Sequence, residues 1–473
     1  MKKIKKIHFT GVKGVGMTPL AVIAKEAGFE VTGSDLADEF ITDGELRKAG
    51  IIVFEGFSRE NVAGVDLLIT TGAHGGFDNP EVLEAKDKNI PVLTQGEAVG
   101  RFMSGDILPR KYEGISVAGS HGKTTTAAMI ATIFKEAKMD PSYVIGTGSI
   151  SSLGAPGHYG KGKYFIAEAD EYATEPKYDK TPKLLWQRPK IAVITNIEFD
   201  HPDLYSSEME IERAFLSFCN KLPPDGVVIA CADEQRVRDL LKEYGGRRIT
   251  YGMSPANDYY IQRYSISGDR MFLWVKNGDT LIGEFSVCVV GEHNAVNALG
   301  AIVASQEAGL TVEAIKKGLS LYSGSKRRFE YVGTLASGAL LYDDYAHHPT
   351  EIKKTLSAFR KAFPKHKIVC VFQPHTYSRT KSLFEQFSTS FSDCDTAVIT
   401  NIYPSLREKK DDTVSSEMLS LNVAKFHKNV LYLPQLSDVV EYIDANSFGK
   451  DTVIVSMGAG DVYKIGEKLD LKK

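Results

Sequence analysis

The sequence predicts an α/β protein of three domains: an N-terminal Rossmann-like domain, a central domain like a P-loop ATPase with a mixed sheet, and a C-terminal Rossmann-like domain. Three observations carry this prediction. The chain of 473 residues is long enough for about three domains of ordinary size. Short apolar runs alternate with helical patterns in its first and last parts, as in parallel sheets. A glycine-rich turn between an apolar run and a helical pattern begins at Gly119.

The first domain is predicted to cover residues 1–108. Apolar runs indicate strands over 4–10, 30–33, 67–71 and 91–93, and helical patterns lie over 19–27 and 80–88. This alternation is typical of βαβ units, in which helices join parallel strands. Residues 104–111 combine glycine, proline and charged side chains, which is the composition of a linker.

The second and third domains are predicted over residues 109–329 and 330–473. In the second, strands are expected over 164–167 and 191–195, antiparallel strands between 258 and 290, and a helix over 291–306. In the third, strands are expected over 340–345, 368–372, 396–400 and 452–456, with helices over 350–363, 382–391 and 436–443. The chain therefore ends in another α/β domain.

The composition is that of an ordinary globular protein and excludes several classes of partner. The formal net charge of −3 is too small to favour nucleic acid or an anionic membrane. No apolar run is long enough to span a bilayer, and the run at 7–11 is too short for a signal peptide. The five scattered cysteines lack zinc-ligand spacing, so we expect reduced, buried thiols in a cytoplasmic protein.

The turn at residues 119–126 reads GSHGKTTT and has the form of a phosphate-binding loop. Its backbone N–H groups and the start of the following helix would cradle phosphates. Lys123 would reach the β/γ-phosphates, and Thr124 would hold Mg²⁺. Val117 stands where the generic motif has glycine, so this is a shorter variant. The alternative is an ordinary turn with a surface lysine, which the strand before it and the helix after it disfavour.

A second glycine-rich turn follows the first predicted strand. Gly11, Gly14 and Gly16 have GxxGxG spacing and precede Met17, and Asp35 ends the second predicted strand about twenty residues on. Such an arrangement is typical of dinucleotide binding, with the acid on a ribose hydroxyl. Because the spacing departs from GxGxxG, the turn favours a nucleoside diphosphate over NAD. A tight turn without a ligand stays an alternative.

Polar side chains gather at the ends of several predicted strands, where parallel sheets bind ligands. The second domain has EADE at 168–171 and TNIEFDH at 195–201, and the third has DDYAHHP at 343–349 and FQPHTYSR at 372–379. A carboxylate and an imidazole beside a triphosphate could hold a second Mg²⁺. Histidine is an unusual ligand for that ion, so the histidine at 201, taken alone, favours a hydrogen-bonding role.

Together these motifs resemble the Mur ligase family, the ATP-dependent amide ligases of peptidoglycan synthesis. The resemblance covers nearly the whole chain and includes GSHGKTTTA, EADE, TNIEFDH, GEHNAVNA at 291–298, the KRRF run and DDYAHHPTE. GVKGVGM, DDYAHHPTEI and FQPHTYSRT are similar to the members that use L-alanine. EADEYATEPKYDK at 168–180 and EFDHPD instead resemble the members that recycle a murein tripeptide.

The resemblance implies ATP and Mg²⁺ as cofactors, UDP-N-acetylmuramate as one substrate, and L-alanine or a short peptide as the other. It implies catalytic roles for Lys123, His201 and His348, and metal binding by Thr124, Glu168 and His201. It places the UDP-sugar at Gly14, Gly16, Met17 and Asp35, and the amino acid at His348, His375 and Arg379. ATP would meet Gly119, Ser120, His121, Gly122, Lys123, Thr124, Thr125, Asn294, Arg328 and Asp344.

The expected reaction joins L-alanine to the carboxylate of UDP-N-acetylmuramate through an acyl phosphate, in the cytoplasm, by a monomer or homodimer. In this family the C-terminal domain usually selects the amine, and its FQPH segment favours L-alanine. L-Ala-γ-D-Glu-diaminopimelate is the alternative acceptor. An NAD-dependent oxidoreductase built on the first glycine motif is the alternative of another class, but it leaves the phosphate loop unexplained.

Overall fold

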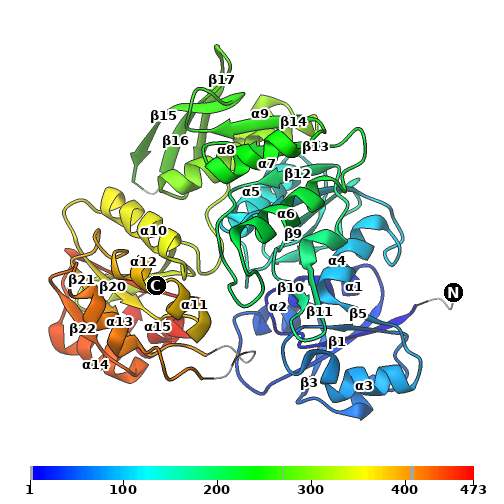
Figure 1. The fold of residues 1–473 in the computed structure, drawn as a ribbon, viewed down its shortest axis with the longest axis horizontal. Coiled ribbons are helices and arrows are strands. Elements are labelled where there is room, and N and C mark those ends of the chain that lie inside the picture. Colours follow the sequence, from blue (N-terminus) through cyan, green and yellow to red (C-terminus); the bar gives the residue numbers. More distant parts are fainter. Residues whose placement is uncertain (1–3, 269, 405–407, 409, 473) are drawn as a thin grey trace. The chain divides into compact units, whose positions relative to one another are not determined.

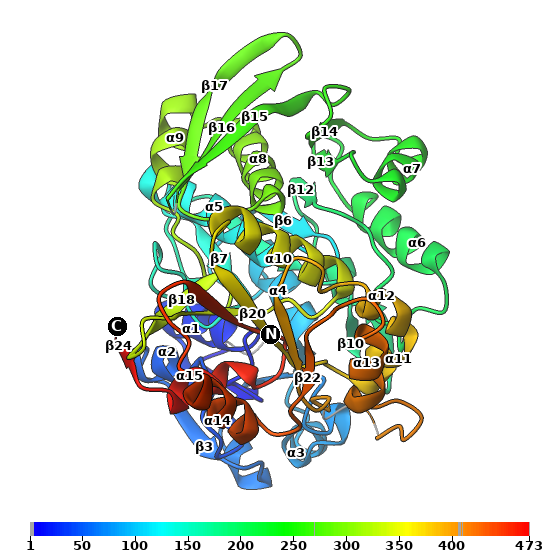
Figure 2. The ribbon, with the colours of Figure 1, turned by 90° about the vertical axis from the view of Figure 1, so that its left-hand side faces the viewer.

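The computed structural model describes residues 4–268, 270–404, 408 and 410–472. Its described residues form two compact units, which Figures 1 and 2 show from two sides. The first unit holds residues 4–265, 271–288 and 295–323. The second holds residues 324–472 together with the short segments 266–270 and 289–294.

The first unit begins with a parallel sheet of five strands in the order β3-β2-β1-β4-β5. These strands are β1 (Lys6–Thr10), β2 (Glu30–Asp35), β3 (Ile52–Glu55), β4 (Leu67–Thr70) and β5 (Val92–Thr94). The helices that join them are α1 (Thr18–Glu26), α2 (Asp43–Lys48), α3 (Pro80–Asp87) and α4 (Gln95–Ser104). The predicted βαβ alternation is therefore confirmed. The sequence pattern missed α2, β3 and α4.

The second sheet of this unit is mixed, with strand order β17-β16-β15-β14-β13-β12-β6-β9-β7-β8. Its strands are β6 (Glu113–Ala118), β7 (Ser142–Val144), β8 (Gly157–His158), β9 (Tyr164–Ala169), β12 (Ile191–Ile194), β13 (Val227–Cys231), β14 (Arg248–Gly252), β15 (Tyr259–Ser267), β16 (Arg270–Asn277) and β17 (Thr280–Val287). β6 lies between the parallel strands β9 and β12, and β16 pairs antiparallel with β17. A separate hairpin is formed by β10 (Ala173–Glu175) and β11 (Asp179–Pro182).

Helices cover both faces of this mixed sheet (Figure 2). One face carries α6 (Glu208–Cys219) and α7 (Gln235–Glu243), whose apolar side chains join the core under β12 and β13. The other carries α5 (Lys123–Glu136), α8 (Glu292–Glu307) and α9 (Val312–Ser320). The parallel strands at the centre are buried on both faces, which explains why they read as continuous apolar runs.

The two sheets of the first unit share one hydrophobic core. Phe9, on β1, belongs to the same buried cluster as Val144, Phe165 and Ala167 of the mixed sheet. Helix α1 lies against β7 and β8, so one helix belongs to the layers of both sheets. The segment predicted as a linker thus joins two sheets that are packed together.

The second unit contains a sheet of order β22-β21-β20-β23-β19-β18-β24. Its strands are β18 (Glu330–Leu335), β19 (Leu340–Asp344), β20 (Lys367–Phe372), β21 (Thr396–Ile399), β22 (Val430–Tyr432), β23 (Thr452–Met457) and β24 (Leu471–Lys472). The five strands from β22 to β19 run parallel, and β18 pairs antiparallel with β19 and β24. Its helices are α10 (Pro349–Ala362), α11 (Tyr377–Ser382), α12 (Phe384–Ser388), α13 (Ser416–Val423), α14 (Leu436–Asn446) and α15 (Ile465–Lys468).

The α/β fold class predicted from the sequence is confirmed, and one predicted helix is wrong. The pattern over 382–391 indicated a single helix, but the structure has α11 and α12 with Leu383 between them. Leu383 has φ −112° and ψ 22°, outside the helical region, and it packs with Phe387 in the core. Burial of these side chains outweighs the local helical preference. Within the part of the chain that is described, no helix is long and apolar enough to cross a membrane.

Candidate active site

The turn between β6 and α5 has a backbone that only glycine can adopt at two places. Gly119 has φ 140° and Gly122 has φ 82°. A Cβ at Gly119 would lie 2.0 Å from Thr195 Oγ1, and a Cβ at Gly122 would lie 2.4 Å from Asn297 Oδ1. The turn is therefore pressed against the loop that follows β12 and against helix α8. Such close backbone approach is typical of phosphate-binding loops.

The loop after β12 holds the phosphate loop in shape. Asn196 Oδ1 accepts a hydrogen bond from the backbone N–H of His121 at 2.9 Å, and its Nδ2 donates to the carbonyl of His121 at 2.9 Å. Ser120 Oγ donates to the carbonyl of Glu198 and accepts from its N–H. The phosphate loop and the loop after β12, which the sequence predicted as separate motifs, are thus joined by hydrogen bonds.

Lys123 is the first residue of α5, and its ammonium group lies back over the phosphate loop. Nζ donates to the carbonyl oxygens of Gly119 at 2.5 Å and Ser120 at 3.3 Å, and to Glu171 Oε2 at 2.7 Å. Burial opposes the charged form, but the neighbouring carboxylates, Glu171 foremost, outweigh it and raise the pKa of Lys123. The lysine is therefore a permanent cation over the loop.

Thr124 and Glu168 lie together beside this loop. Thr124 Oγ1 donates to Glu168 Oε2 at 2.9 Å, and the backbone N–H of Gly146 donates to Glu168 Oε1 at 2.5 Å. Glu168 comes from the end of β9, the strand next to β6. A hydroxyl and a carboxylate are the oxygen donors that Mg²⁺ prefers, so these two residues fit a magnesium site.

His201, the third predicted metal ligand, lies next to Glu171. Its Nε2 is 4.0 Å from Glu171 Oε1 and 3.8 Å from Asp200 Oδ2. Glu171 Oε1 is buried and has no hydrogen-bond partner in the described structure. The predicted set of Thr124, Glu168 and His201 stays a prediction.

The hairpin of β10 and β11 links this site to the first sheet. Lys177 Nζ lies 2.6 Å from Asp78 Oδ2, and the Tyr178 hydroxyl donates to Asp78 Oδ1 at 2.8 Å. A Cβ at Gly76 would lie 2.0 Å from Glu175 Oε1, so the hairpin presses on the loop that follows β4. The segment EADEYATEPKYDK therefore runs from the phosphate loop to the first sheet.

The first glycine turn is held by Asp35. Its Oδ2 accepts the N–H of Lys13 at 2.7 Å, its Oδ1 accepts the N–H of Leu36 at 2.8 Å, and His74 Nε2 lies 3.5 Å away. Burial raises the pKa of Asp35, and the two backbone donors offset this only in part. Gly14 donates through its N–H to the carbonyl of Gly11 and thereby closes the turn.

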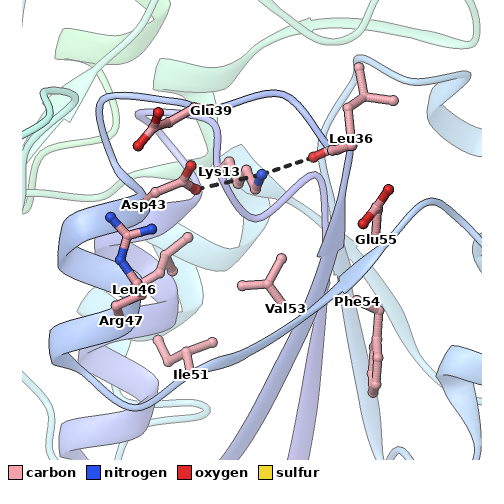
Figure 3. Close-up of a pocket in the computed structure, with 11 residues that line it drawn as sticks. Lys13, Leu36, Glu39, Asp43, Leu46, Arg47, Ile51, Val53, Phe54 and Glu55 are labelled. Atoms are coloured by element: carbon pink, nitrogen blue, oxygen red, sulfur yellow. Dashed lines mark hydrogen bonds and ion pairs between the residues drawn. The ribbon is translucent and has the colours of Figure 1, made fainter.

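A cavity of about 450 Å³ opens beside this turn, between the ends of β2 and β3 and helix α2 (Figure 3). Leu46, Ile51 and Val53 give it apolar walls. Lys13 enters from the glycine turn, and its Nζ donates to the carbonyl of Leu36 at 2.8 Å. Glu39, Asp43, Arg47 and Glu55 supply further polar groups. A cavity at the end of β2 that is lined by both apolar and polar groups suits the base and ribose of a nucleotide.

In the second unit, Asp344 ends β19, is buried, and accepts hydrogen bonds from two backbone N–H groups. Its Oδ2 accepts the N–H of Phe329 at 2.8 Å, and its Oδ1 accepts the N–H of Ala346 at 2.9 Å. Arg327 is buried against Asp343 and the carbonyls of 458 and 460, so it holds the fold together. By contrast, the guanidinium of Arg328 lies 3.9 Å from the carboxylate of Glu351 and over the ring of Tyr345.

Asp344 gives the second unit a pH-dependent stability. Burial raises its pKa from 3.8 to about 6, and Arg328 offsets this only in part. A raised folded-state pKa means that the folded protein binds the proton more tightly, so this contribution is complete below pH 4 and is lost as the pH rises through 6. We expect the unfolding free energy of wild type relative to Asp344→Asn to fall by about 2.5 kcal/mol between pH 4 and pH 8.

Urea denaturation at several pH values measures this difference. The matched control is Asp470→Asn, at an exposed position, for which the difference should stay constant. A constant difference for Asp344→Asn as well would contradict the assignment.

His348, His375 and Arg379 lie at the ends of β19 and β20. His348 is the N-cap of α10, where Nδ1 accepts the N–H of Thr350 at 3.3 Å. Arg379 is buried, and its Nη1 lies 3.2 Å from His375 Nδ1. Because arginine only donates, Nδ1 of His375 accepts, so the neutral ring carries its proton on Nε2. Thr376, between them in the chain, has φ 69°, a strained value for this residue type.

Several residues of the site were missed by the sequence reasoning. They are His74 after β4, Glu171 beside Lys123, Asn297 on α8, and Glu408, whose carboxylate accepts the N–H groups of Tyr377 and Ser378. Glu171 and Asn297 lie inside the motifs EADE and GEHNAVNA, so these two motifs could have identified them as candidate site residues. Asn294, predicted to meet adenine, donates through Nδ2 to the carbonyl of Val290 at 2.8 Å.

Comparisons with known proteins match all three parts of the chain. Residues 6–106 match the Mur ligase family catalytic domain, residues 117–305 the Mur ligase middle domain, and residues 327–460 the Mur ligase glutamate ligase domain. The chain is similar to UDP-N-acetylmuramate–L-alanine ligase of Carboxydothermus hydrogenoformans, at 39% identity over 99% of this chain and 97% of that protein.

Solved structures agree with this similarity. The crystal structure of the UDP-N-acetylmuramate-alanine ligase from Thermotoga maritima has a TM-score of 0.81 and 26% identity, covering 98% of this chain and 97% of that one. A murein peptide ligase from Psychrobacter arcticus has a TM-score of 0.70 and 24% identity, covering 98% of each chain, and shares the fold.

Proposed function

The chain belongs to the Mur ligase family, and from this premise we propose that it joins L-alanine to the carboxylate of UDP-N-acetylmuramate and converts ATP to ADP and phosphate. The observation that carries the proposal is the full-length similarity to an L-alanine ligase, at 39% identity. The buried phosphate loop, with Lys123 over it and Thr124 and Glu168 beside it, supports the ATP-dependent part. We place the reaction in the cytoplasm and the enzyme as a monomer or homodimer.

The chemistry requires an activated carboxylate. A carboxylate is a poor acyl donor because its oxygen does not leave, and transfer of the γ-phosphoryl group of ATP converts it to an acyl phosphate. The amine of L-alanine then attacks the acyl carbon, a tetrahedral intermediate forms, and phosphate departs. Proteins assist such steps mainly by positioning and by neutralising charge.

The phosphate loop does most of this work. The start of α5 and the backbone N–H groups of the loop that are not already engaged would meet the phosphates of ATP, and Lys123 would donate to the oxygens that gain charge during transfer. Thr124 and Glu168 would hold Mg²⁺, which neutralises phosphate charge when bound. Asn196 keeps the loop in its binding shape through His121.

The UDP-sugar is proposed to bind the first sheet. The turn of Gly14, Gly16 and Met17 would face the diphosphate, and the cavity beside it would take the uridine. Asp35 is buried and holds the N–H of Lys13, so its contribution would be to fix the turn as well as to meet the ribose side of the nucleotide. Asn294, Arg328 and Asp344 would meet ATP, and His348, His375 and Arg379 would line the amino-acid site.

We expect Asp35→Ala to weaken UDP-N-acetylmuramate binding by about tenfold or more and to leave ATP affinity unchanged. In this variant the backbone at the glycine turn loses two charge-assisted hydrogen bonds to Asp35, each worth about 1.5–3 kcal/mol. The turn is then no longer held in the shape that binds the nucleotide. Calorimetry with each nucleotide measures both affinities. Asp38→Ala, at an exposed neighbouring position, is the control. Impaired ATP binding with normal UDP-sugar binding would reverse the assignment of nucleotides to sheets.

The tripeptide alternative rests on the segment EADEYATEPKYDK. Its hairpin contacts the loop after β4 in the proposed UDP-sugar domain, through Glu175, Lys177 and Tyr178. These contacts give the segment a role in the part of the protein that we propose binds the sugar nucleotide. L-alanine ligases and tripeptide ligases use the same sugar nucleotide, so the segment does not distinguish the two acceptors. We therefore keep L-alanine as the acceptor. An NAD-dependent oxidoreductase would leave the phosphate loop and its carboxylates without a role, so we do not propose it.

One experiment tests the proposal. The enzyme is incubated with ATP, Mg²⁺ and UDP-N-acetylmuramate, together with L-alanine or with the tripeptide, and the product mass and ADP release are measured. We expect the mass of the L-alanine adduct and one ADP for each bond formed. Efficient ligation of the tripeptide with no use of L-alanine would overturn the acceptor while leaving an ATP-dependent ligase.

A further inference from the structure

One face of the first sheet carries buried polar side chains where β1 and β2 lie side by side. Strand β1 contributes His8 and Thr10, and in the register of the two strands these residues pair with Thr32 and Ser34 of β2. All four residues are buried. Parallel strands that are buried on both faces are usually apolar on both, so this polar group needs a hydrogen-bonding partner.

The partner is Glu81, in the first turn of α3, and its side chain is completely buried. Oε2 accepts hydrogen bonds from the hydroxyls of Thr10 at 2.6 Å and Ser34 at 2.7 Å, and lies 3.2 Å from His8 Nε2. Oε1 accepts a hydrogen bond from Asn61 Nδ2 at 2.7 Å. Burial opposes the charged form, but the hydrogen bonds on Oε2 outweigh it and lower the pKa of Glu81. The carboxylate is therefore ionised inside the protein.

The two hydroxyls on this carboxylate belong to the residues that directly precede the nucleotide-binding turn. Thr10 is followed by Gly11, and Ser34 is followed by Asp35. The carbonyl of Ser34 accepts the N–H groups of Gly11 at 2.9 Å and Val12 at 3.1 Å. Because the turn is bonded to the end of β2 in this way, a carboxylate that fixes both strand ends also fixes the turn.

The loop after β3 is tied to the same carboxylate. Asn61 lies on the 3-10 helix η1 (Arg59–Val62), and its Nδ2 lies within hydrogen-bond distance of the carbonyl of Gly56, at 3.3 Å, as well as of Glu81. The N–H of Gly56 donates to the carbonyl of Asp35 at 2.8 Å. This loop is thus bonded at one end to Glu81 and at the other to the backbone of Asp35.

The loop after β4 is tied to Glu81 through the start of α3. Asn79, the N-cap of this helix, accepts the N–H of Glu81 at 3.0 Å and donates through Nδ2 to the carbonyl of His74 at 2.9 Å. His74 Nε2 in turn lies 3.5 Å from the carboxylate of Asp35. The loops after β1, β2, β3 and β4 are therefore all connected to Glu81, and they meet around Asp35.

We propose that Glu81 is a positioning residue for the UDP-sugar, which fixes these four loops through its ionised carboxylate. The inference rests on the proposed function, because it requires the UDP-sugar to bind at this edge of the first sheet. Glu81 is completely buried, so it would act through the loops and not by contact with the ligand. Apolar side chains in place of a buried charge often leave a protein equally stable, so we assign the network to the shape of the site.

A crossed pair of variants at Thr10 separates the hydrogen bond from the packing. Thr10→Val keeps the shape of the side chain and loses the hydroxyl, whereas Thr10→Ser keeps the hydroxyl and loses a methyl group. We expect Thr10→Val to raise KM for UDP-N-acetylmuramate about tenfold and Thr10→Ser to raise it less than about twofold. In both variants kcat and the KM for ATP should stay unchanged, which is the pattern of lost ground-state binding.

Glu81→Gln should have the larger effect on the same KM, about 10- to 100-fold, because its amide offers one acceptor oxygen in place of two. Steady-state kinetics with each substrate varied measures KM and kcat, and urea denaturation measures the unfolding free energy of each variant. Thr32→Val removes a buried hydroxyl that bonds to His8 on the same face, so it should lower stability and keep KM. Asp87→Asn, at an exposed position on α3, should change neither quantity.

The outcomes distinguish this inference from the proposed function. Thr10→Val and Glu81→Gln proteins that are less stable but keep the wild-type KM for UDP-N-acetylmuramate would overturn the inference. An equal rise of KM for Thr10→Ser and Thr10→Val, or an equal rise for both nucleotides, would also overturn it. The Thr10 pair decides the question even if Glu81→Gln does not fold. A wild-type protein that neither binds nor ligates UDP-N-acetylmuramate would overturn the proposed function, and the inference with it.

Discussion

Replacing Lys123 with alanine should lower the rate of ligation by a factor of about 10²–10³, because one electrostatic group that stabilises a transition state contributes roughly this much. Lys123 Nζ lies over the phosphate loop and is held as a cation by Glu171. ATP-dependent product formation, followed by mass, measures the loss. Lys135→Ala, at an exposed position on the same helix, should retain normal turnover. Near-normal turnover of a folded Lys123→Ala protein would remove the assignment of the phosphate loop.

The same variant tests how the buried ion pair contributes to stability. Lys123→Ala leaves the carboxylate of Glu171, which is 1% exposed, without its ammonium partner. Breaking a buried pair in this way costs about 3–5 kcal/mol. The double variant Lys123→Ala/Glu171→Gln removes the stranded charge and should recover most of that loss without recovering activity. This comparison separates loss of fold from loss of catalysis.

The second large effect is expected at Arg379. Arg379→Lys should raise KM for L-alanine about 10- to 100-fold with little change in kcat, because hydrogen bonds to a charged group contribute about 1.5–3 kcal/mol. Arginine donates two parallel hydrogen bonds to a carboxylate, whereas lysine is a point charge. The position of Arg379 beside His375, at the end of β20, supports this role.

Steady-state kinetics with each substrate varied in turn measures this effect. Lys381→Ala, at an exposed position on the same helix, is the control. An unchanged KM for L-alanine in folded Arg379→Lys would place the amino-acid carboxylate elsewhere. A rise in KM confined to ATP would assign Arg379 to the nucleotide.

The sequence could predict those parts of the site that are local in the chain. The phosphate loop is contiguous: strand β6, the turn and helix α5 follow one another within residues 113–136, and the glycines report the turn directly. The glycine turn with Asp35 is nearly as local, because β1 and β2 are adjacent parallel strands. Alternating strands and helices likewise predicted the α/β class.

The remaining parts depend on packing between distant segments. Glu171 meets Lys123 across 48 residues, and the contact depends on the register of β9 against β6. Asn297 reaches Gly122 only because helix α8 packs across the mixed sheet. The break at Leu383 depends on which side chains the core buries. No periodicity in the sequence encodes these distances.

The core shared by the first two sheets has a consequence for how the protein unfolds. Val144, Phe165 and Ala167 are completely or almost completely buried in the cluster that contains Phe9, so a chain cut near residue 108 would expose apolar surface on both fragments. The salt bridge between Lys177 and Asp78 adds a further link between these layers. The first two predicted domains should therefore melt together in one cooperative calorimetric transition. Neither fragment should give a sharp transition by itself.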